Sequence, residues 1–385
     1  MRRNRVEMIK VIIDGACGKM SSAVVSSLYN KKKWLFIIAV FLPLLIFGQT
    51  PITENVIQVD TVKKVELYDI KAIANGSYAQ WSPDGKKVAF VGESDKPPSL
   101  AQMSLGGDVW VINSDGKREA QKLTSCGYIL DFVWSPDSKE IAYISNEYGT
   151  NPQSWLNVVN IKSGKARIIY GPWTPHTFYL REIRWLKDGY IRFFEKTKAS
   201  LMPDWVVIDK FGKIPKKITS SEKIVYSDFN EALWIMNADG TEKKRLVWSE
   251  KPNISFSEPA WSKEAKKIAV NVKDSNAIKL AITDEDGKMW RILTDSGVGQ
   301  EWSPDGKWII CFVFMEHIWS KAYNSELFLI SPDGKHRFQL TKTPDIVESG
   351  AQWSPDGTKI LFTIGYPYRE KNIFIATVTI TKNKE

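Results

Sequence analysis

The pentapeptide WSPDG occurs three times, at residues 81–85, 302–306 and 353–357, and a near copy, WSPDS, occupies residues 134–138. Proline fits the first corner of a type I turn because its ring fixes φ near about −65°, and glycine takes the left-handed φ that closes a bulged hairpin. A strand ending in Trp precedes the turn, and an alternating apolar run such as KKVAFV follows it. Each copy therefore predicts a hairpin with a large aromatic anchor at its base.

The phrase belongs to a longer repeat. Its tryptophans recur as Trp81, Trp134, Trp185, Trp261, Trp302 and Trp353, and the phrase decays to WLKDG and WSKEA at the third and fourth. A second turn, often Asp-Gly, has its glycine at 116, 164, 212, 240, 287 and 334, so the period is close to 48 with one short step of 28. Two hairpins in each unit of about 40–50 residues are typical of a β-propeller blade.

The repeat predicts an all-β fold, a single β-propeller over residues 65–381. Six units of 48 residues and one of 28 fill the body, which favours seven blades with an abbreviated fourth, and six blades is the alternative. The last unit ends in NIFIATVTI, a third strand without a following hairpin, so its fourth strand must come from the N-terminal run VKKVELYDI. We expect this strand to close the ring and remove two exposed sheet edges.

Residues 31–48 read as a secretory signal peptide. Three lysines precede the apolar run 34–47, and Gly48 is a small residue at a plausible cleavage point. Fourteen apolar residues are short for a membrane span, which favours a cleaved signal, and an uncleaved anchor is the alternative. Residues 49–64 form a polar lead-in, and we expect the propeller to be exported to the periplasm or the extracellular space.

Residues 1–30 form an extension in front of this signal. The stretch MIKVIIDGACGKM, with Gly15, Gly18 and Met20, resembles the opening of dihydrodipicolinate reductases, whose first strand, turn and helix bind a nicotinamide cofactor. That resemblance makes an NAD(P)-binding reductase fragment a remote alternative. A signal sequence and a β-rich body follow instead of a parallel sheet, so we interpret the extension as a fusion scar.

The repeats AQWSPDGKKVAFVG and DVWVINSDGKREAQKLT, with later copies such as QEWSPDGKWIICFV, resemble those of the TolB-like, WD-like β-propeller family. The same repeat builds the propeller domains of prolyl-oligopeptidase-like proteins. Those relatives carry a serine nucleophile on a G-x-S-x-G elbow, and this sequence contains no such motif. The resemblance therefore implies a propeller without the hydrolase domain, and leaves an enzymatic role uncertain and disfavoured.

Large side chains gather in the loops that we expect on the face opposite the turns. Exposed aromatic side chains suit a protein, peptide or glycan partner, although packing between blades is the alternative. The candidate ligand-binding face consists of Trp173, His176, Tyr179, His317, Trp319, Tyr366, Tyr368 and Arg369.

Four acidic residues precede predicted first strands, where they should approach the mouth of the central channel: Asp131, Glu182, Glu258 and Glu348. They could attract a cation or a basic peptide, or remain solvated loop carboxylates. No metal-ligand spacing is present, and no ligand loop of the EF-hand kind supports calcium, so we predict no cofactor.

The net charge of +9 is concentrated at the N-terminus. Residues 1–48 carry eight basic and two acidic side chains, which leaves a nearly balanced body and no support for nucleic-acid binding. We expect membrane contact only through an uncleaved leader. The sequence favours an exported module that binds an envelope protein or peptide, with a propeller enzyme acting on polysaccharide at the channel mouth as the alternative.

Overall fold

The structure is a computed structural model that describes residues 62–95, 107–146, 153–173, 181–195, 204–215, 222–227, 232–247, 254–274, 277–315, 324–343, 346–365 and 371–382. These residues form 26 β-strands and no helix, which confirms the all-β prediction. The described part of the chain accordingly offers no helix that could cross a bilayer. The predicted extension and signal peptide, residues 1–48, lie outside the described residues, as does most of the lead-in.

Most of the strands form small antiparallel sheets, each built from strands that are consecutive in the chain. The first two of these sheets have four strands each. The first contains β2 (Ser77–Trp81), β3 (Lys87–Gly92), β4 (Asp108–Asn113) and β5 (Gln121–Lys122). The second contains β6 (Ile129–Trp134), β7 (Glu140–Asn146), β8 (Ser154–Asn160) and β9 (Ala166–Trp173).

Two three-stranded sheets and another four-stranded sheet follow. They are β10 (Arg181–Trp185), β11 (Ile191–Glu195) and β12 (Asp204–Ile208), then β13 (Lys223–Ser227), β14 (Leu233–Asn237) and β15 (Lys244–Val247). The four-stranded sheet has β16 (Ser255–Ser262), β17 (Lys267–Lys273), β18 (Ile278–Asp284) and β19 (Trp290–Thr294).

The remaining strands share one eight-stranded sheet. Its first half has β20 (Val298–Trp302), β21 (Ile309–Phe314), β22 (Ser325–Ile330) and β23 (Arg337–Gln339), and its second half has β24 (Val347–Trp353), β25 (Lys359–Gly365), β26 (Lys371–Lys382) and β1 (Val62–Asn75). A single parallel pair, Ser325 with Val347, joins the halves. β1 pairs antiparallel with β26 from Val62–Lys382 to Asn75–Asn372, so the N-terminal strand supplies the outer strand beside the last hairpin.

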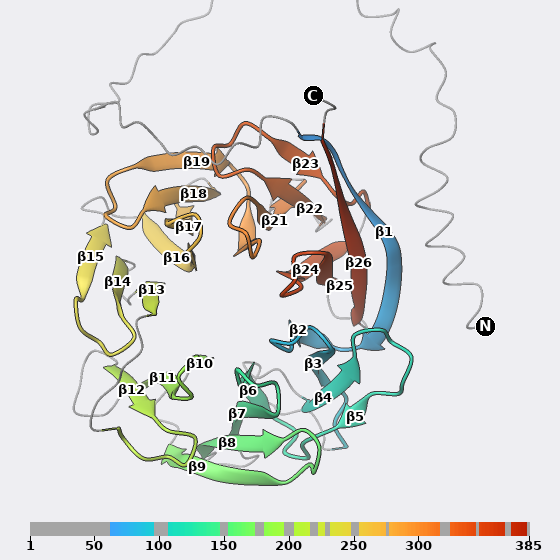
Figure 1. The fold of residues 1–385 in the computed structure, drawn as a ribbon, viewed down its shortest axis with the longest axis vertical. Coiled ribbons are helices and arrows are strands. Elements are labelled where there is room, and N and C mark those ends of the chain that lie inside the picture. Colours follow the sequence, from blue (N-terminus) through green and yellow to red (C-terminus); the bar gives the residue numbers. More distant parts are fainter. Residues whose placement is uncertain are drawn as a thin grey trace, which may run out of the picture. The chain divides into compact units, whose positions relative to one another are not determined.

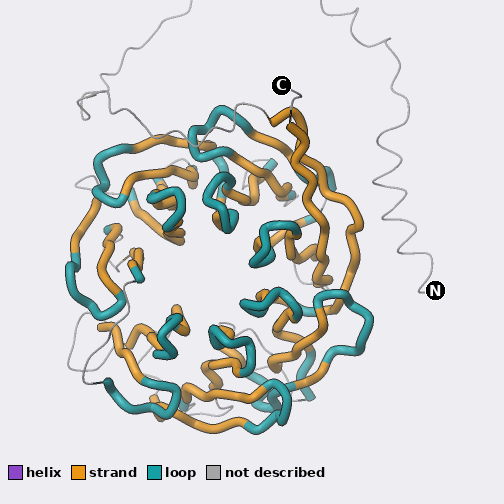
Figure 2. The backbone as a smooth tube through the Cα atoms, viewed as in Figure 1, coloured by secondary structure: helices purple, strands orange, loops and turns teal. Residues whose placement is uncertain are grey.

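Within residues 62–382 the sheets follow one another around a central opening, which is the arrangement of a β-propeller (Figure 1). Strands and turns alternate along the trace (Figure 2). Strands such as β2, β6, β10 and β24 lie next to the opening, whereas β1 lies on the outer rim (Figure 1). Separate apolar clusters lie between consecutive sheets; one, for example, joins Val91 and Val109 to Ile129 and Phe132. Another joins the first and last sheets through Val88 and Leu361. The core is therefore divided among the interfaces between sheets.

The WSPDG turns have the geometry that their residues predict. Gly85 has φ of 69°, and its N–H donates to the Ser82 carbonyl at 2.9 Å. The Ser82 hydroxyl also donates to Asp84 at 2.6 Å, so the serine of the phrase bonds to both its aspartate and its glycine. In the near copy, Ser138 occupies the glycine position with φ of 58° and accepts a hydrogen bond from the Asp84 N–H at 3.1 Å. That contact joins the turns of neighbouring sheets.

The innermost strands share an irregularity that the sequence did not reveal. In each strand that contains a repeat tryptophan, the pairing with the next strand shifts register before the Trp, for example between Ser77 and Gln80 and between Ser257 and Ala260. The residue three positions before the Trp has positive φ in several copies, including Tyr78 at 52° and Glu258 at 49°. Such bulges bend a strand and change the direction of its side chains.

Candidate functional site

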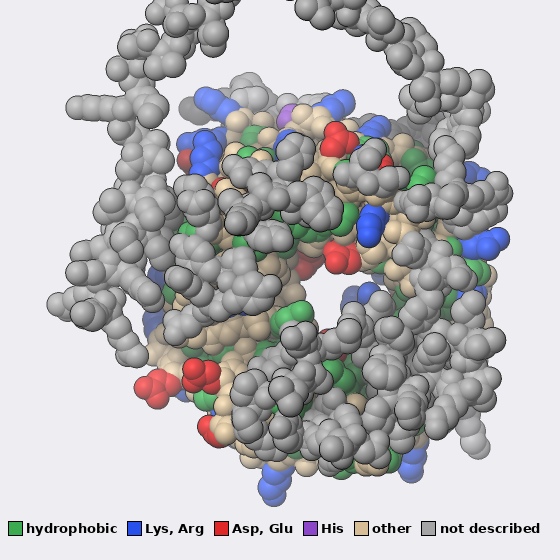
Figure 3. Space-filling view, turned by 180° about the vertical axis from the view of Figure 1, so that it is seen from behind, with side chains coloured by type: hydrophobic (Ala, Val, Ile, Leu, Met, Phe, Trp, Pro, Cys, Tyr) green, Lys and Arg blue, Asp and Glu red, His purple; other side chains and the backbone are tan. Residues whose placement is uncertain are grey.

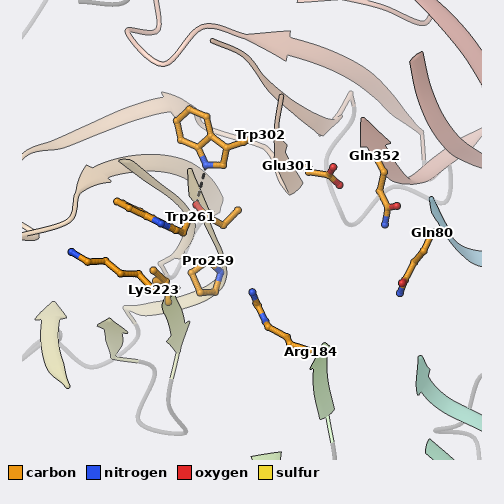
Figure 4. A pocket seen from close by; sticks show the side chains of 10 residues that line it. Gln80, Arg184, Lys223, Pro259, Trp261, Glu301, Trp302 and Gln352 are labelled. Atoms are coloured by element: carbon orange, nitrogen blue, oxygen red, sulfur yellow. Dashed lines mark hydrogen bonds between the residues drawn. The ribbon is translucent and has the colours of Figure 1, made fainter. Parts of the chain in front are cut away.

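A pocket of about 590 Å³ lies where the innermost strands meet, and its lining comes from six strands: Gln80, Arg184, Lys223, Val225, Pro259, Ala260, Trp261, Glu301, Trp302 and Gln352 (Figure 4). This volume is within the usual range of ligand sites, roughly 300–1,000 Å³. The space-filling view from behind shows an open passage at the centre, with acidic and basic side chains at its rim (Figure 3). The pocket is therefore open to solvent and polar.

Most of the polar lining residues directly precede a repeat tryptophan. Because side chains alternate along a strand, burial of the Trp on the flank of the sheet turns the preceding residue toward the opening. Trp302 is 8% exposed and its Nε1 donates to the Ala260 carbonyl of the preceding sheet at 2.9 Å (Figure 4). The anchor thus fixes the residue beside it, Glu301, at the pocket wall.

Two basic side chains belong to the lining, but their surroundings differ. Lys223 leaves β13 in the direction away from Glu301 (Figure 4), and its Nζ forms an ion pair with Glu285 Oε2 at 2.7 Å. Arg184 extends from β10 into the cavity and is exposed (Figure 4). Among the described residues it has no ion-pair or hydrogen-bond partner. Within the described lining, Arg184 is thus the uncompensated cation.

Glu301 carries the carboxyl group among the lining residues that the structure describes. Its Oε1 accepts a hydrogen bond from the backbone N–H of Trp353 at 3.2 Å, which links β20 to β24. Burial outweighs this hydrogen bond and raises the pKa of Glu301 to about 8. The side chain is therefore mostly a neutral carboxylic acid at pH 7.

Two of the predicted channel-mouth acids bond to the neighbouring sheet. Asp131 Oδ2 accepts the Ile183 N–H at 3.1 Å, and Glu258 Oε2 accepts the Gly299 N–H at 3.2 Å and an amide hydrogen of Asn271 at 3.0 Å. Backbone N–H groups that face the next sheet would otherwise lack a partner. These carboxylates therefore satisfy backbone donors between sheets.

Glu348, the third described acid, lies in β24 and is 2% exposed. Its carboxylate accepts bonds from the Thr341 hydroxyl at 2.6 Å, the Thr343 hydroxyl at 2.9 Å and the Leu327 N–H at 3.0 Å. Burial, together with the nearby Glu326 carboxylate, nevertheless raises its pKa to about 7. The carboxyl group is thus enclosed in protein.

The rest of the predicted site falls beyond what the structure describes. His176, Tyr179, His317, Trp319, Tyr366, Tyr368 and Arg369 lie outside the described residues, and only the backbone of Trp173 and Glu182 is described, in β9 and β10. The aromatic ligand-binding face therefore stays a prediction. Within the described ranges, no group of three or more His, Cys, Asp or Glu residues is placed to hold a metal ion.

Sequence reasoning missed Gln80, Arg184, Glu301 and Gln352. The signal was available, since each of them stands immediately before a tryptophan of the repeat. Finding it required knowing that the strand ending in Trp is the innermost strand of its sheet and that the Trp turns away from the opening. The two glutamines and the two charged residues at this position make the pocket wall differ from sheet to sheet.

Comparison with known proteins gives partial similarity. No protein-family model matches the chain. A stretch of 155 residues, 39% of the chain, is 28% identical to dipeptidyl-peptidase 5 of Porphyromonas gingivalis. The chain spans only 22% of the length of that relative.

Solved structures similar to this chain include a TolB and the propeller domain of a protease. TolB from Acinetobacter baumannii is 19% identical, with 68% of this chain and 64% of that chain covered and a TM-score of 0.42. The β-propeller domain of the trilobed protease from Pyrococcus furiosus is 15% identical, with 70% and 84% covered and a TM-score of 0.48.

An oligogalacturonate lyase in complex with manganese is also similar, at 12% identity, 79% and 77% coverage and a TM-score of 0.40. At these TM-scores the fold assignment rests on the sheets themselves. None of these similarities supports the reductase resemblance of residues 8–28, which lie outside the described residues.

Proposed function

We propose that the protein is an exported, TolB-like β-propeller that binds a protein or peptide of the cell envelope, and that the ligand enters the central pocket. The observation that carries the proposal is the pocket itself, which takes polar side chains from the innermost strands of several sheets. A ligand in this position would contact many sheets at once. The leader pattern of residues 31–48 supports export.

The proposed scaffold has seven blades, with β13–β15 as the abbreviated fourth, and β1 closes the ring. The sheet β13–β15 lacks a Trp phrase. Its strand β13 takes the innermost position, since Lys223 and Val225 line the pocket. Two contacts support closure: the cluster joining Val88 to Leu361 and the pairing of β1 with β26. Six blades, with this segment as an insertion, stays the alternative.

Removal of β1 tests the closure. A chain that begins at residue 76 should melt at a clearly lower temperature and aggregate, because β26 would expose unpaired backbone groups. A chain that begins at residue 58 keeps β1 and serves as the matched control. Equal melting temperatures for the two chains would contradict closure by the N-terminal strand.

Capture from envelope extracts tests the binding role. The wild-type protein should retain a specific protein or peptide, and a bulky Gln352→Tyr substitution in the pocket should reduce its recovery. Ile292→Tyr, at a side chain that is 49% exposed, adds the same bulk elsewhere and should leave recovery unchanged. Equal recovery by both variants would place the ligand outside the pocket, and no recovery by the wild type would count against the function.

The alternative, an enzyme acting on polysaccharide, has one specific observation in its favour. Glu301 lines the pocket as a carboxylic acid that keeps its proton at neutral pH, the state that a general acid requires. Glycosidases of the common kind use a second carboxyl group, and the described lining of this pocket holds Glu301 alone. Turnover on a polysaccharide panel that is lost in Glu301→Gln would favour the enzyme.

A further inference from the structure

We propose that the central pocket recognises a carboxylate of its ligand, with the guanidinium of Arg184 as the counter-charge. The carboxylate is either the C-terminus of a peptide or an aspartate or glutamate side chain. This inference rests on the proposed binding function and names the chemical group that the pocket selects.

The two cations of the described lining differ in whether a partner compensates their charge. Lys223 is already paired with Glu285 at 2.7 Å, so its charge is largely compensated. Arg184 enters the cavity from β10 without an ionic or hydrogen-bond partner among the described residues (Figure 4). A guanidinium presents N–H donors in a planar fork that matches the two oxygens of a carboxylate. Charge-assisted hydrogen bonds of this bidentate kind are stronger than those between neutral groups.

The opposite wall supplies hydrogen-bonding groups without a strong opposing charge. Glu301 and Gln352 approach the cavity from β20 and β24 (Figure 4). The Gln352 amide makes no hydrogen bond to the described residues, so both its donor and its acceptor are available to the backbone of a peptide. Gln80 is partly engaged, since its Nε2 donates to the Phe132 carbonyl at 2.9 Å.

The number of charges limits the class of ligand. Among the described lining residues the ionisable groups are Arg184, Lys223 and Glu301, and of these Arg184 alone is an uncompensated cation. A polyphosphate, a nucleic acid or a polyuronate would bring several negative charges into a space that compensates one. A single carboxylate on an otherwise neutral ligand balances the pocket. The volume of about 590 Å³ suits a short peptide segment.

The protonation of Glu301 supports this balance. Burial raises its pKa to about 8, so at pH 7 it adds little negative charge. The ligand carboxylate is ionised and arginine is protonated at all pH values near neutrality. Affinity for a carboxylate ligand should therefore fall as the pH rises through about 8, and Glu301→Gln should flatten that dependence.

Peptide arrays test the proposal with the full-length chain. One array carries random short peptides joined through their N-termini with free C-terminal carboxylates, and a second carries the same peptides as C-terminal amides. Both are probed at pH 7 with the wild type and with Arg184→Gln. We expect the wild type to retain peptides with a free C-terminus or with internal Asp or Glu. Arg184→Gln should lower the affinity for these peptides at least about tenfold, because charge-assisted hydrogen bonds are stronger than neutral ones.

Two control variants sharpen the comparison. Arg118→Gln removes an exposed arginine charge outside the pocket and should retain the wild-type preference. Lys223→Gln removes a charge that is already paired and should have a smaller effect than Arg184→Gln. The exposed position of Arg184 means that its substitution should leave the melting temperature unchanged.

The two arrays separate the sources of the carboxylate, since loss of binding on amidation identifies the C-terminus and its persistence identifies a side chain. Peptides retained equally with and without carboxylates, or retained equally by Arg184→Gln, would overturn the inference while leaving peptide binding intact. Failure of the wild type to retain any peptide would overturn both this inference and binding of peptides in the pocket.

Discussion

Replacement of Glu348 by glutamine should make the folding stability less dependent on pH. Glu348 is 2% exposed, and burial together with Glu326 raises its pKa from about 4.5 to about 7. Glutamine resembles the neutral acid in size and in having one acceptor and a donor group. The amide oxygen of the glutamine can accept a hydrogen bond from one of the two threonine hydroxyls. The other hydroxyl can rotate and accept a hydrogen bond from the amide N–H. We therefore expect Glu348→Gln to fold at neutral pH.

The sign follows from which state binds the proton more tightly. The folded state holds the proton up to about pH 7 and the unfolded state releases it near 4.5, so between these values the folded state binds more protons. The stabilisation is complete below about pH 4.5 and is lost as the pH rises through 7. A difference of about 2.5 pKa units corresponds to about 3 kcal/mol of unfolding free energy. Glu348→Gln should lack this loss.

Urea unfolding at pH 5, 6, 7 and 8 measures the effect. The variant should match the wild type within about 1 kcal/mol at pH 5 and exceed it by up to about 3 kcal/mol at pH 8. Glu326→Gln is the matched comparison: removing the like charge should shift the pH at which the wild-type loss occurs to a lower value. A Glu348→Gln variant that is less stable than the wild type at pH 8, with the same pH slope, would show that the three donors hold Glu348 ionised and would refute the reasoning.

Two further pairs of variants test the interfaces between sheets. In urea unfolding, Trp302→Phe should lower the free energy of unfolding by about 1 kcal/mol more than Trp353→Phe. The reason is that Trp302 Nε1 donates to the Ala260 carbonyl at 2.9 Å, whereas the buried Trp353 Nε1 has no hydrogen-bond partner among the described residues. Equal losses of free energy would show that both tryptophans stabilise the fold through packing alone. Gly306→Ala should lower the melting temperature more than Gly85→Ala, although φ is nearly the same at the two glycines, 68° at Gly306 and 69° at Gly85. A Cβ added at Gly306 would lie 2.8 Å from the Ala265 nitrogen, whereas a Cβ added at Gly85 would lie 3.7 Å from the Pro355 side chain. Similar melting temperatures for the two variants would contradict the close approach at Gly306.

The fold could be predicted because its signals are local. Serine, proline, aspartate and glycine fix a turn within four residues, and the same phrase recurs wherever a hairpin needs that turn. Ser138 shows the limit of reading glycine as obligatory, since a serine holds φ of 58° there and its hydroxyl bonds to the neighbouring turn. The pairing of β1 with β26 joins residues more than 290 positions apart, yet a missing strand in the last unit was enough to indicate it.

The roles of the acids could not be predicted, because they depend on contacts between sheets. Asp131 and Glu258 stand at equivalent positions before their tryptophans, and the sequence shows only that they are acidic and near a strand. The N–H groups that they accept, from Ile183 and Gly299, belong to the following sheet. The bulge that aims them there has no residue signature: tyrosine, glutamate and glycine all occupy it with positive φ.

Arg184 shows how a functional candidate can be hidden in a structural repeat. The repeat requires a tryptophan at the end of each first strand, and the alternation of side chains then turns the preceding position toward the central opening. The scaffold does not dictate the residue at that position, which is Gln, Val, Arg, Ala, Glu and Gln in successive copies. The tryptophan is kept in all six copies while the residue before it changes, which separates the residues that hold the sheets together from those that face the pocket. On this reasoning the position before each tryptophan, rather than the conspicuous phrase after it, determines what the pocket binds.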